Sequence, residues 1–297
     1  LLPNEDLLDA VQALKPGQKL LAGDQWLAHR NGDEAVAYTG DYHLLQYPEQ
    51  IFAWNGRELE ADYDLLTAGR SSQPISSTNT VLGDRIFLEH GAKVEAAILN
   101  ATTGPIYLAA DSEIMEGSIV RGGLALGEHS QLKLGTKIYG PTTIGPHSKV
   151  GGEVNNSVIW GYSNKGHDGF LGNAVLGQWC NIGADSNNSN LKNNYDEVRR
   201  WSYVSKRFER TGMQFCGLII GDHSKCGINT MFNTATVVGV SANIYGGGFP
   251  RNFIPSFAWG GAEKWMVYRF DKAMEVADKV MERRSIKLDE VEIAILK

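Results

Sequence analysis

The chain has 297 residues, of which 42% are hydrophobic and 21% charged, and its formal net charge is −6. This is the composition of a folded globular protein, which excludes disordered and collagen-like chains, and the acidic total argues against a nucleic-acid partner. No apolar run approaches the roughly 20 residues of a membrane span, so no membrane partner is expected.

The cysteines and the start of the chain bear on its compartment. Cys180, Cys216 and Cys226 form no disulfide framework and fit a reducing environment, which predicts a cytoplasmic protein. The first residues, Leu1 to Asp6, are not a signal peptide and do not begin with Met, so we expect a processed or truncated product.

Residues 1–78 mix short apolar runs with turn signals, and we predict a small α/β part there. A helix is expected across Tyr47–Asn55, with Pro48 near its first turn. The Ser-rich stretch Ser71–Ser77 is typical of a linker. A second domain is therefore predicted to begin at residue 79.

The middle of the chain repeats an aliphatic residue every six positions. The first run is Leu108, Ile114, Val120, Leu126, Leu132, Ile138, Ile144 and Val150. The phase slips at Asn155-Asn156, and we expect the inward positions to resume at Val158, Asn164 (a polar exception), Phe170, Leu176 and Ile182. A third run is Ile220, Cys226, Phe232, Val238 and Ile244.

A period of six is that of a hexapeptide parallel β-helix. Gly often follows the aliphatic residue, as in Leu126-Gly127 and Ile144-Gly145, and Gly makes up 34 residues, about 11% against a usual value of about 7%. We attribute this excess to corners at which the backbone must turn. The prediction is a mainly β fold, a left-handed parallel β-helix over 79–261; a β-sandwich with coincidental spacing is the alternative.

The repeat fails between Ile182 and Ile220, which predicts an insertion over 185–215. The insertion carries five cations, Arg199, Arg200, Lys206, Arg207 and Arg210. They could meet phosphates or carboxylates of a ligand; alternatively, the insertion is a solvated helix that packs against a neighbour. From Ala262 to the end, apolar residues at spacings of three and four predict a helical segment over 262–297.

None of the seven histidines has zinc spacing with another histidine or a cysteine, so no metal is predicted. His167 is distinctive because polar residues crowd around it, in the stretch from Ser163 to Asn173. A lone histidine is most often a surface or satisfied residue, and composition alone favours that interpretation.

Several segments nevertheless resemble one family in register. They are Asn156–Ile159, Ser163–Asn173, Asn181–Ala184, Asn190-Leu191 and Gly217–Asn229. They resemble the acetyltransferase half of GlmU-type bifunctional sugar-1-phosphate nucleotidyltransferase/acetyltransferases, with the greatest likeness to the archaeal enzymes, over roughly residues 80–248. The resemblance implies an acetyl-CoA-dependent acyltransferase acting on an amino sugar phosphate or nucleotide sugar, assembled as a homotrimer with active sites between adjacent prisms.

The resemblance also assigns roles to residues. It places His167 at the catalytic base and Asn190 in the catalytic site, and it implies that Asn181 helps to hold the sugar. We expect Lys192 to bind the substrate as well. Four residues are expected to bind acetyl-CoA. Ser241 and Ala242 are placed at its groove by a looser match, and Lys225 and Arg251 are expected at its phosphates because of their charge, with the cationic insertion as the alternative.

Two substrate-binding positions depart from the family pattern. Phe170 stands where the family has a Tyr, and Asn155 where it has a Lys that contacts the sugar phosphate. These changes bear on the sugar substrate more than on the acyl chemistry.

The N-terminal part has a fainter likeness to the end of a sugar nucleotidyltransferase domain, through Tyr47–Asn55 and Leu65-Leu66. The Gly-rich loop with Arg that holds a nucleoside triphosphate is absent, so this chain alone is not expected to transfer nucleotides. Two alternatives to an acyltransferase follow. The β-helix could be a trimerising or regulatory scaffold of a nucleotidyltransferase, or a sugar- or lipid-binding module without catalysis.

Overall fold

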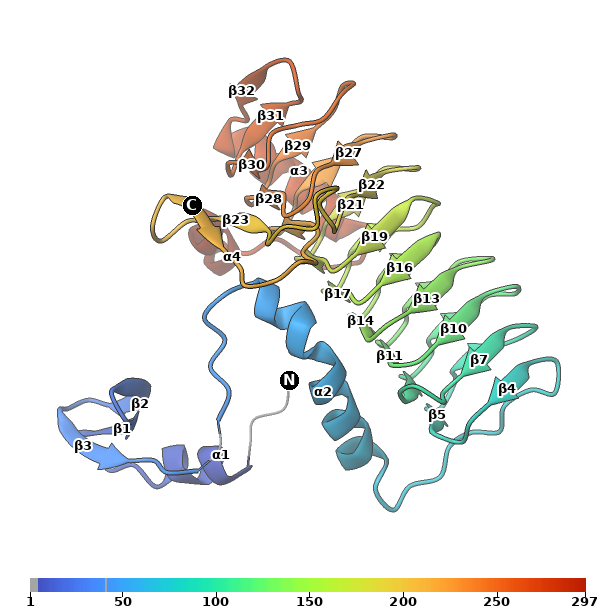
Figure 1. Cartoon of the computed structure of the whole chain (residues 1–297), viewed down its shortest axis with the longest axis horizontal. Helices are drawn as coiled ribbons and strands as arrows, with labels where there is room; N and C mark the ends of the chain where they lie inside the picture. The colour runs from blue at the N-terminus through green and yellow to red at the C-terminus, as the bar shows by residue number, and fades with distance from the viewer. Residues whose placement is uncertain (1–4, 41) are drawn as a thin grey trace. The chain divides into compact units, whose positions relative to one another are not determined.

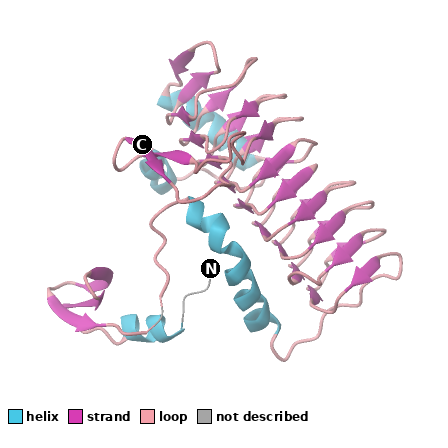
Figure 2. Ribbon diagram, in the orientation of Figure 1, coloured by secondary structure: helices cyan, strands magenta, loops and turns pink. Residues whose placement is uncertain are grey.

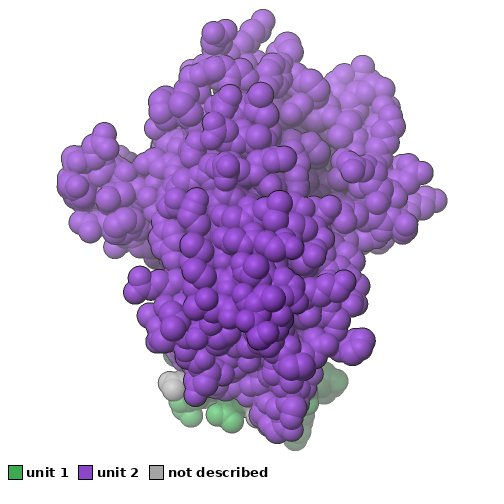
Figure 3. Space-filling model, turned by 90° about the vertical axis from the view of Figure 1, so that its right-hand side faces the viewer, with its two compact units in different colours: residues 1–46 green, residues 47–297 purple. Residues whose placement is uncertain are grey.

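The computed structural model describes residues 5–40 and 42–297, which divide into the compact units 1–46 and 47–297, coloured separately in Figure 3. The first unit contains α1 (Glu5–Gln12) and a three-stranded sheet in the order β2 (Gln25–Arg30), β1 (Gln18–Ala22), β3 (Glu34–Ala37). β1 pairs antiparallel with β2 and parallel with β3. This unit is the small α/β element expected near the N-terminus.

The second unit is built on a three-sided prism of short parallel strands, one coil stacked on the next (Figures 1 and 2). Face 1 consists of β4 (Thr80–Leu82), β7 (Ile98–Asn100), β10 (Ile119–Arg121), β13 (Lys137–Tyr139), β16 (Glu153–Asn155) and β19 (Phe170–Gly172). Above β19, face 1 continues with β22 (Asn187–Asn188) and β27 (Met231–Phe232).

The other two faces complete each coil. Face 2 consists of β5 (Ile86–Leu88), β8 (Ile106–Leu108), β11 (Leu124–Leu126), β14 (Thr142–Ile144), β17 (Val158–Ile159), β20 (Val175–Leu176), β25 (Ile219–Ile220), β28 (Val237–Val238) and β30 (Phe253–Ile254). Face 3 consists of β6 (Lys93–Val94), β9 (Glu113–Ile114), β12 (Gln131–Leu132), β15 (Lys149–Val150), β18 (Asn164–Lys165), β21 (Asn181–Ile182), β26 (Lys225–Cys226), β29 (Asn243–Ile244), β31 (Ala258–Gly260) and β32 (Trp265–Val267). The predicted left-handed parallel β-helix is confirmed.

The aliphatic repeat forms the interior of the prism. Every residue of the first run is at most 1% exposed, and Leu126 pairs with Leu108 below and Ile144 above. The third run, from Ile220 to Ile244, is at most 5% exposed. Both runs therefore point inward as predicted, because stacking removes their side chains from water on every coil.

The predicted phase of the second run is wrong by one residue at its first three positions, whereas Leu176 and Ile182 point inward as predicted. Leu132 pairs with Val150 on the next coil, eighteen residues later, but Val150 pairs with Lys165 after only fifteen, so this coil is three residues shorter. The short coil makes Ile159, Lys165 and Leu171 the inward residues and turns Val158, Asn164 and Phe170 outward. Since Val158-Ile159 and Phe170-Leu171 are apolar pairs, periodicity could not decide which member points inward.

The glycines that follow inward residues serve a different purpose from the one expected. A Cβ on Gly127 would lie 2.7 Å from the backbone nitrogen of Pro146, and one on Gly145 would lie 2.5 Å from that of Gly161. These glycines are therefore required by close stacking of coils, and neither has a positive φ.

Non-glycine residues occupy left-handed backbone conformations at the corner between faces 2 and 3. Their rings stack along the prism in the order His129, His147, Tyr162, Trp179, His223, with centroid separations of 4.2–6.2 Å. This ladder gives three of the seven histidines a structural role.

Helix α2 (Glu49–Thr67) lies along face 2, against β14, β17 and β20 (Figure 1). It begins directly after Pro48, two residues later than predicted, and extends twelve residues beyond Asn55. Phe52 is 1% exposed, and the Asn55 amide donates to Pro141 O at 3.0 Å and accepts from the Thr143 hydroxyl at 2.7 Å. The helix grouped with the N-terminal part in the sequence analysis thus packs on the prism.

The insertion forms a β-hairpin and not the helix that was its alternative, and the C-terminal segment is less helical than expected. Asn188 is buried in the coil, and the insertion then forms an antiparallel hairpin of β23 (Arg199–Ser202) and β24 (Arg207–Arg210). After β32, which pairs with β31, the chain forms α3 (Phe270–Glu282) and α4 (Glu290–Leu296). Met266 therefore lies in a strand, because the chain turns back after β31 to form an antiparallel hairpin before α3 begins.

Candidate active site

His167 lies at the corner that leads from β18 on face 3 to β19 on face 1, and its side chain is exposed. The coils on either side fix this corner. Asp185 N donates to Asp168 O at 2.9 Å, and a Cβ on Gly169, where φ is +114°, would overlap Ser186 O. No hydrogen bond to the imidazole occurs within residues 5–40 and 42–297. A rigid backbone thus presents a ring that is free to meet a ligand.

Lys165 supports the same corner from inside the prism. Its side chain is 2% exposed, and its Nζ donates to Gly151 O at 2.9 Å and to His167 O at 2.8 Å. Burial lowers the pKa of Lys165 to about 8, while Asp168 and Asp185 act in the opposite direction. A cation in an otherwise aliphatic core therefore holds the backbone carbonyl of the candidate base.

Polar side chains extend from His167 along both faces that meet at its corner. On face 3, Asn164 donates to Asn181 Oδ1 at 3.0 Å, one coil above. On face 1, Phe170 lies on the outer surface, and its backbone N–H donates to Asn187 Oδ1 at 2.7 Å. His167 is thus flanked by an amide pair on one side and by an aromatic ring and an amide on the other.

Asn190 lies at the next corner, between faces 1 and 2. Its amide donates to Asn173 Oδ1 at 2.8 Å, and the Asn173 backbone N–H donates to Asn155 O at 3.0 Å. A Cβ on Gly172 would lie 2.9 Å from Asn190 Nδ2 and would overlap the Phe170 ring. Gly172 therefore lets Phe170 and Asn190 approach one another across face 1, with Asn155 on the coil below.

The predicted binding residues are more scattered. Lys192 lies at the start of the insertion, 4.0 Å from Asp196. Lys225 lies one coil above Asn181 on face 3. Its Nζ donates to His223 O at 2.9 Å, and burial lowers its pKa. Ser241 and Ala242 are 3% and 1% exposed. Arg251 alone of the four residues expected to bind acetyl-CoA has an exposed side chain.

Sequence reasoning missed Lys165, Asn173 and Asn187. A signal for Lys165 was present, because Gly166 follows it as Gly follows many inward residues. The two asparagines carried none, since their partners lie on other coils.

Residues 5–40 and 42–297 contain no group of three or more His, Cys, Asp or Glu side chains placed to hold a metal ion. No helix among them is long and apolar enough to cross a membrane.

Replacing Lys165 with Met is expected to leave stability nearly unchanged at pH 7 but to lower it relative to wild type at high pH. A lysine pKa of about 8, against an ordinary 10.5, costs the charged form about 3 kcal/mol, which offsets its two hydrogen bonds of about 1–1.5 kcal/mol each. Above pH 8 the unfolded chain binds more protons than the folded one, so the wild type gains stability up to about pH 10.5 and the Met variant does not.

Urea unfolding at pH 7 and pH 10 measures this difference. Lys149→Met, a substitution on the neighbouring strand whose lysine faces outward, serves as the matched control. A Lys165→Met effect that is equal at both pH values would contradict the assignment.

The chain is similar to known proteins in sequence and in fold. A family described as sugar nucleotidyl transferase matches residues 1–71. The Bifunctional protein GlmU of Picosynechococcus is 27% identical over 172 residues, which cover 57% of this chain and 31% of that protein. The bifunctional sugar-1-phosphate nucleotidylyltransferase/acetyltransferase of Sulfurisphaera tokodaii is 26% identical over 181 residues, covering 60% and 44%.

The chain spans between about a third and under a half of the length of these relatives. Among solved structures, the polySia specific acetyltransferase NeuO matches with 14% identity and a TM-score of 0.39, over 71% of this chain and 99% of that one.

Proposed function

We propose that this chain, which resembles GlmU-type bifunctional proteins, transfers an acetyl group from acetyl-CoA to the amine of an amino sugar phosphate or nucleotide sugar, with His167 as general base. The observation that carries the proposal is the exposed His167 imidazole on a rigid corner, with Asn181 on one adjoining face and Phe170 and Asn190 along the other. The sequence similarity to acetyltransferase-containing relatives supports the same chemistry.

The reaction requires one proton to move. As the amine nitrogen attacks the thioester carbonyl, His167 removes its proton, a C–N bond forms and the C–S bond breaks. The imidazolium then returns the proton to the departing thiolate. Imidazole suits this role because it exchanges protons near neutral pH.

The polar neighbours would orient the acceptor and stabilise the transition state. The amides of Asn181 and Asn190 can donate to and accept from sugar hydroxyl and acetamido groups. Backbone N–H groups of corner 166–169 are the candidates for binding the oxyanion, and one such donor contributes about 3 kcal/mol in other enzymes. Phe170 offers an apolar surface for a sugar ring, and Asn155 provides a neutral group beside it.

The assembly and compartment complete the proposal. A homotrimer would place a second prism opposite the shallow surface around His167, and the exposed aliphatic side chains of Ile98 and Ile119 on face 1 favour such a contact. The cysteines are unpaired and buried, which supports a cytoplasmic location.

Release of free thiol from acetyl-CoA, measured across a panel of amino sugar phosphates and nucleotide sugars, tests the proposal. We expect at least one amino sugar to give saturable, acceptor-dependent release. Release that never depends on an acceptor would overturn an acyltransferase role.

The match of residues 1–71 to sugar nucleotidyl transferases favours a second candidate function. In this alternative, the prism is a trimerising or regulatory scaffold for a nucleotidyltransferase. The two candidates differ in one observable, since a scaffold would show no acetyl-CoA binding by calorimetry.

A further inference from the structure

The cationic insertion, which the proposed mechanism does not use, borders two adjoining open cavities on the prism. The larger, of about 490 Å³, is lined by Arg199, Phe208, Arg251, Asn252 and Phe253. The smaller, of about 250 Å³, shares Arg199 and Asn252 with it and adds Lys192, Val198, Asn233 and Thr234. We propose that these cavities bind a nucleoside diphosphate group. The proposal deepens the proposed function and rests on it, because acetyl-CoA and nucleotide sugars both carry this group.

The charges of the lining favour a polyanion. Lys192, Arg199 and Arg251 line the two cavities, and the lining contains no carboxylate. Arg199 donates one bond, from Nη2 to Phe208 O at 3.0 Å, which fixes its guanidinium without neutralising it. Arg251 is exposed, and its side chain makes no ion pair with any residue in 5–40 or 42–297. Two guanidinium groups beside one cavity suit the oxygens of adjacent phosphates.

The aromatic residues of the larger cavity add a surface for a planar base. Phe208 comes from the hairpin and Phe253 from the prism. Trp201 stacks on Phe253 with centroids 4.2 Å apart and meets Phe208 edge-on at 5.3 Å, which holds both rings in place. Bases stack on such rings with little dependence on their identity.

The cavities lie at the same corner of the prism as part of the candidate active site. Asn233 and Thr234 follow β27 on face 1, Asn252 precedes β30 on face 2, and Asn190 occupies the equivalent corner below them. The Ser189 and Thr234 hydroxyl groups, 2.8 Å apart, join these two levels. A ligand whose nucleotide occupies the cavities can therefore extend its other end along face 1 toward His167.

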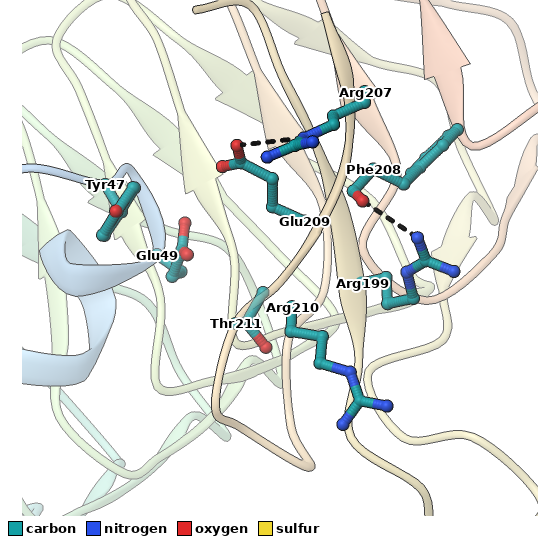
Figure 4. A pocket seen from close by; sticks show the side chains of 8 residues that line it. All are labelled: Tyr47, Glu49, Arg199, Arg207, Phe208, Glu209, Arg210 and Thr211. Atoms are coloured by element: carbon teal, nitrogen blue, oxygen red, sulfur yellow. Dashed lines mark hydrogen bonds and ion pairs between the residues drawn. The ribbon is translucent and has the colours of Figure 1, made fainter. Parts of the chain in front are cut away.

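The hairpin also supplies a matched control. Arg199, Trp201 and Phe208 share one of its faces, and Arg200, Arg207 and Glu209 share the other, because side chains alternate along each strand. Figure 4 shows the Arg207–Glu209 pair and the Arg199–Phe208 contact beside a further pocket of about 460 Å³, which all four residues line. Arg207 lines neither of the two cavities described above, so Arg207→Ala removes the same charge from the same hairpin and leaves their linings complete.

Isothermal titration calorimetry with CoA, ADP, UDP and inorganic pyrophosphate tests the proposal on the full chain. We expect Arg251→Ala to weaken binding of all four at least tenfold and Arg207→Ala to change it less than twofold. Phe208→Leu should weaken the three nucleotides severalfold and leave pyrophosphate unchanged. Tighter binding of CoA than of UDP would indicate that the acetyl donor supplies the nucleotide, and tighter binding of UDP would indicate that the sugar acceptor does.

Several results would overturn the proposal: no binding of any nucleotide, equal effects of Arg251→Ala and Arg207→Ala, or pyrophosphate bound as tightly as ADP. His167→Ala separates this outcome from that of the proposed function. Nucleotide binding unchanged by His167→Ala supports the cavity, even where acetyl transfer proves absent.

Discussion

Replacing His167 with Ala is expected to lower acetyl transfer at least a hundredfold. A positioned general base contributes about 10²–10⁴-fold, and the nearby carboxylates, those of Asp168 and of Asp185 on the next coil, are a class of much weaker bases than imidazole. The melting temperature should change by no more than about 2 °C, since the side chain is exposed and the corner is held through backbone atoms.

Acetyl-transfer rates and melting temperatures of His167→Ala and His90→Ala, measured side by side, test both expectations. His90 is another exposed histidine of the prism, far along the chain from the candidate site, so its removal should leave the rate unchanged. Near-wild-type turnover by His167→Ala would sink the proposed mechanism.

The second large effect concerns stability and the hairpin that forms the nucleotide cavity. Glu49→Leu is expected to lower the free energy of unfolding by about 3 kcal/mol or more. Arg200 Nε donates to Glu49 Oε2 at 2.6 Å, and the two side chains are 4% and 3% exposed. Removing the carboxylate leaves the Arg200 guanidinium buried without its direct partner. The remaining neighbours, the Tyr47 ring at 4.9 Å and Glu209 at 3.9 Å, are too distant to replace the lost ion pair.

Urea unfolding of three variants separates this interaction from packing. Arg210→Ala breaks an exposed ion pair with Glu197 and should cost less than about 1 kcal/mol. The double variant Glu49→Leu with Arg200→Met should recover much of the loss, because it leaves no unpaired buried charge. A single Glu49→Leu variant as stable as wild type would contradict the role given to this pair.

Much of the fold could be predicted because the prism repeats a local rule. Residues such as Leu126 and Ile144 occupy equivalent positions on successive coils, so one period predicts both their burial and their pairing. The rule failed where the coil shortens, and there the sequence offered two apolar candidates at adjacent positions, as in Phe170-Leu171. That one-residue error concealed Lys165 as an inward residue.

The candidate site was predictable in part for a different reason. His167, Asn181 and Asn190 were selected by resemblance. In the structure, His167 lies at the corner between faces 3 and 1, Asn181 lies on face 3, and Asn190 lies at the corner between faces 1 and 2. Contacts between distant segments carried no sequence signal. Glu49 and Arg200 are 151 residues apart and meet only because α2 and the insertion pack beside the same face. The nucleotide cavity likewise depends on how the hairpin folds back onto Phe253.

The central claim is that the prism transfers acetyl groups with His167 as the base. Its most direct test is incubation of the wild-type protein and His167→Ala with carbon-13-labelled acetyl-CoA and the amino sugar selected by the thiol-release panel, followed by mass spectrometry of the sugar. We expect the label on the sugar nitrogen with wild type, and at least a hundredfold less of it with His167→Ala. Label that stays on coenzyme A, or that reaches the sugar equally with both proteins, would contradict the claim.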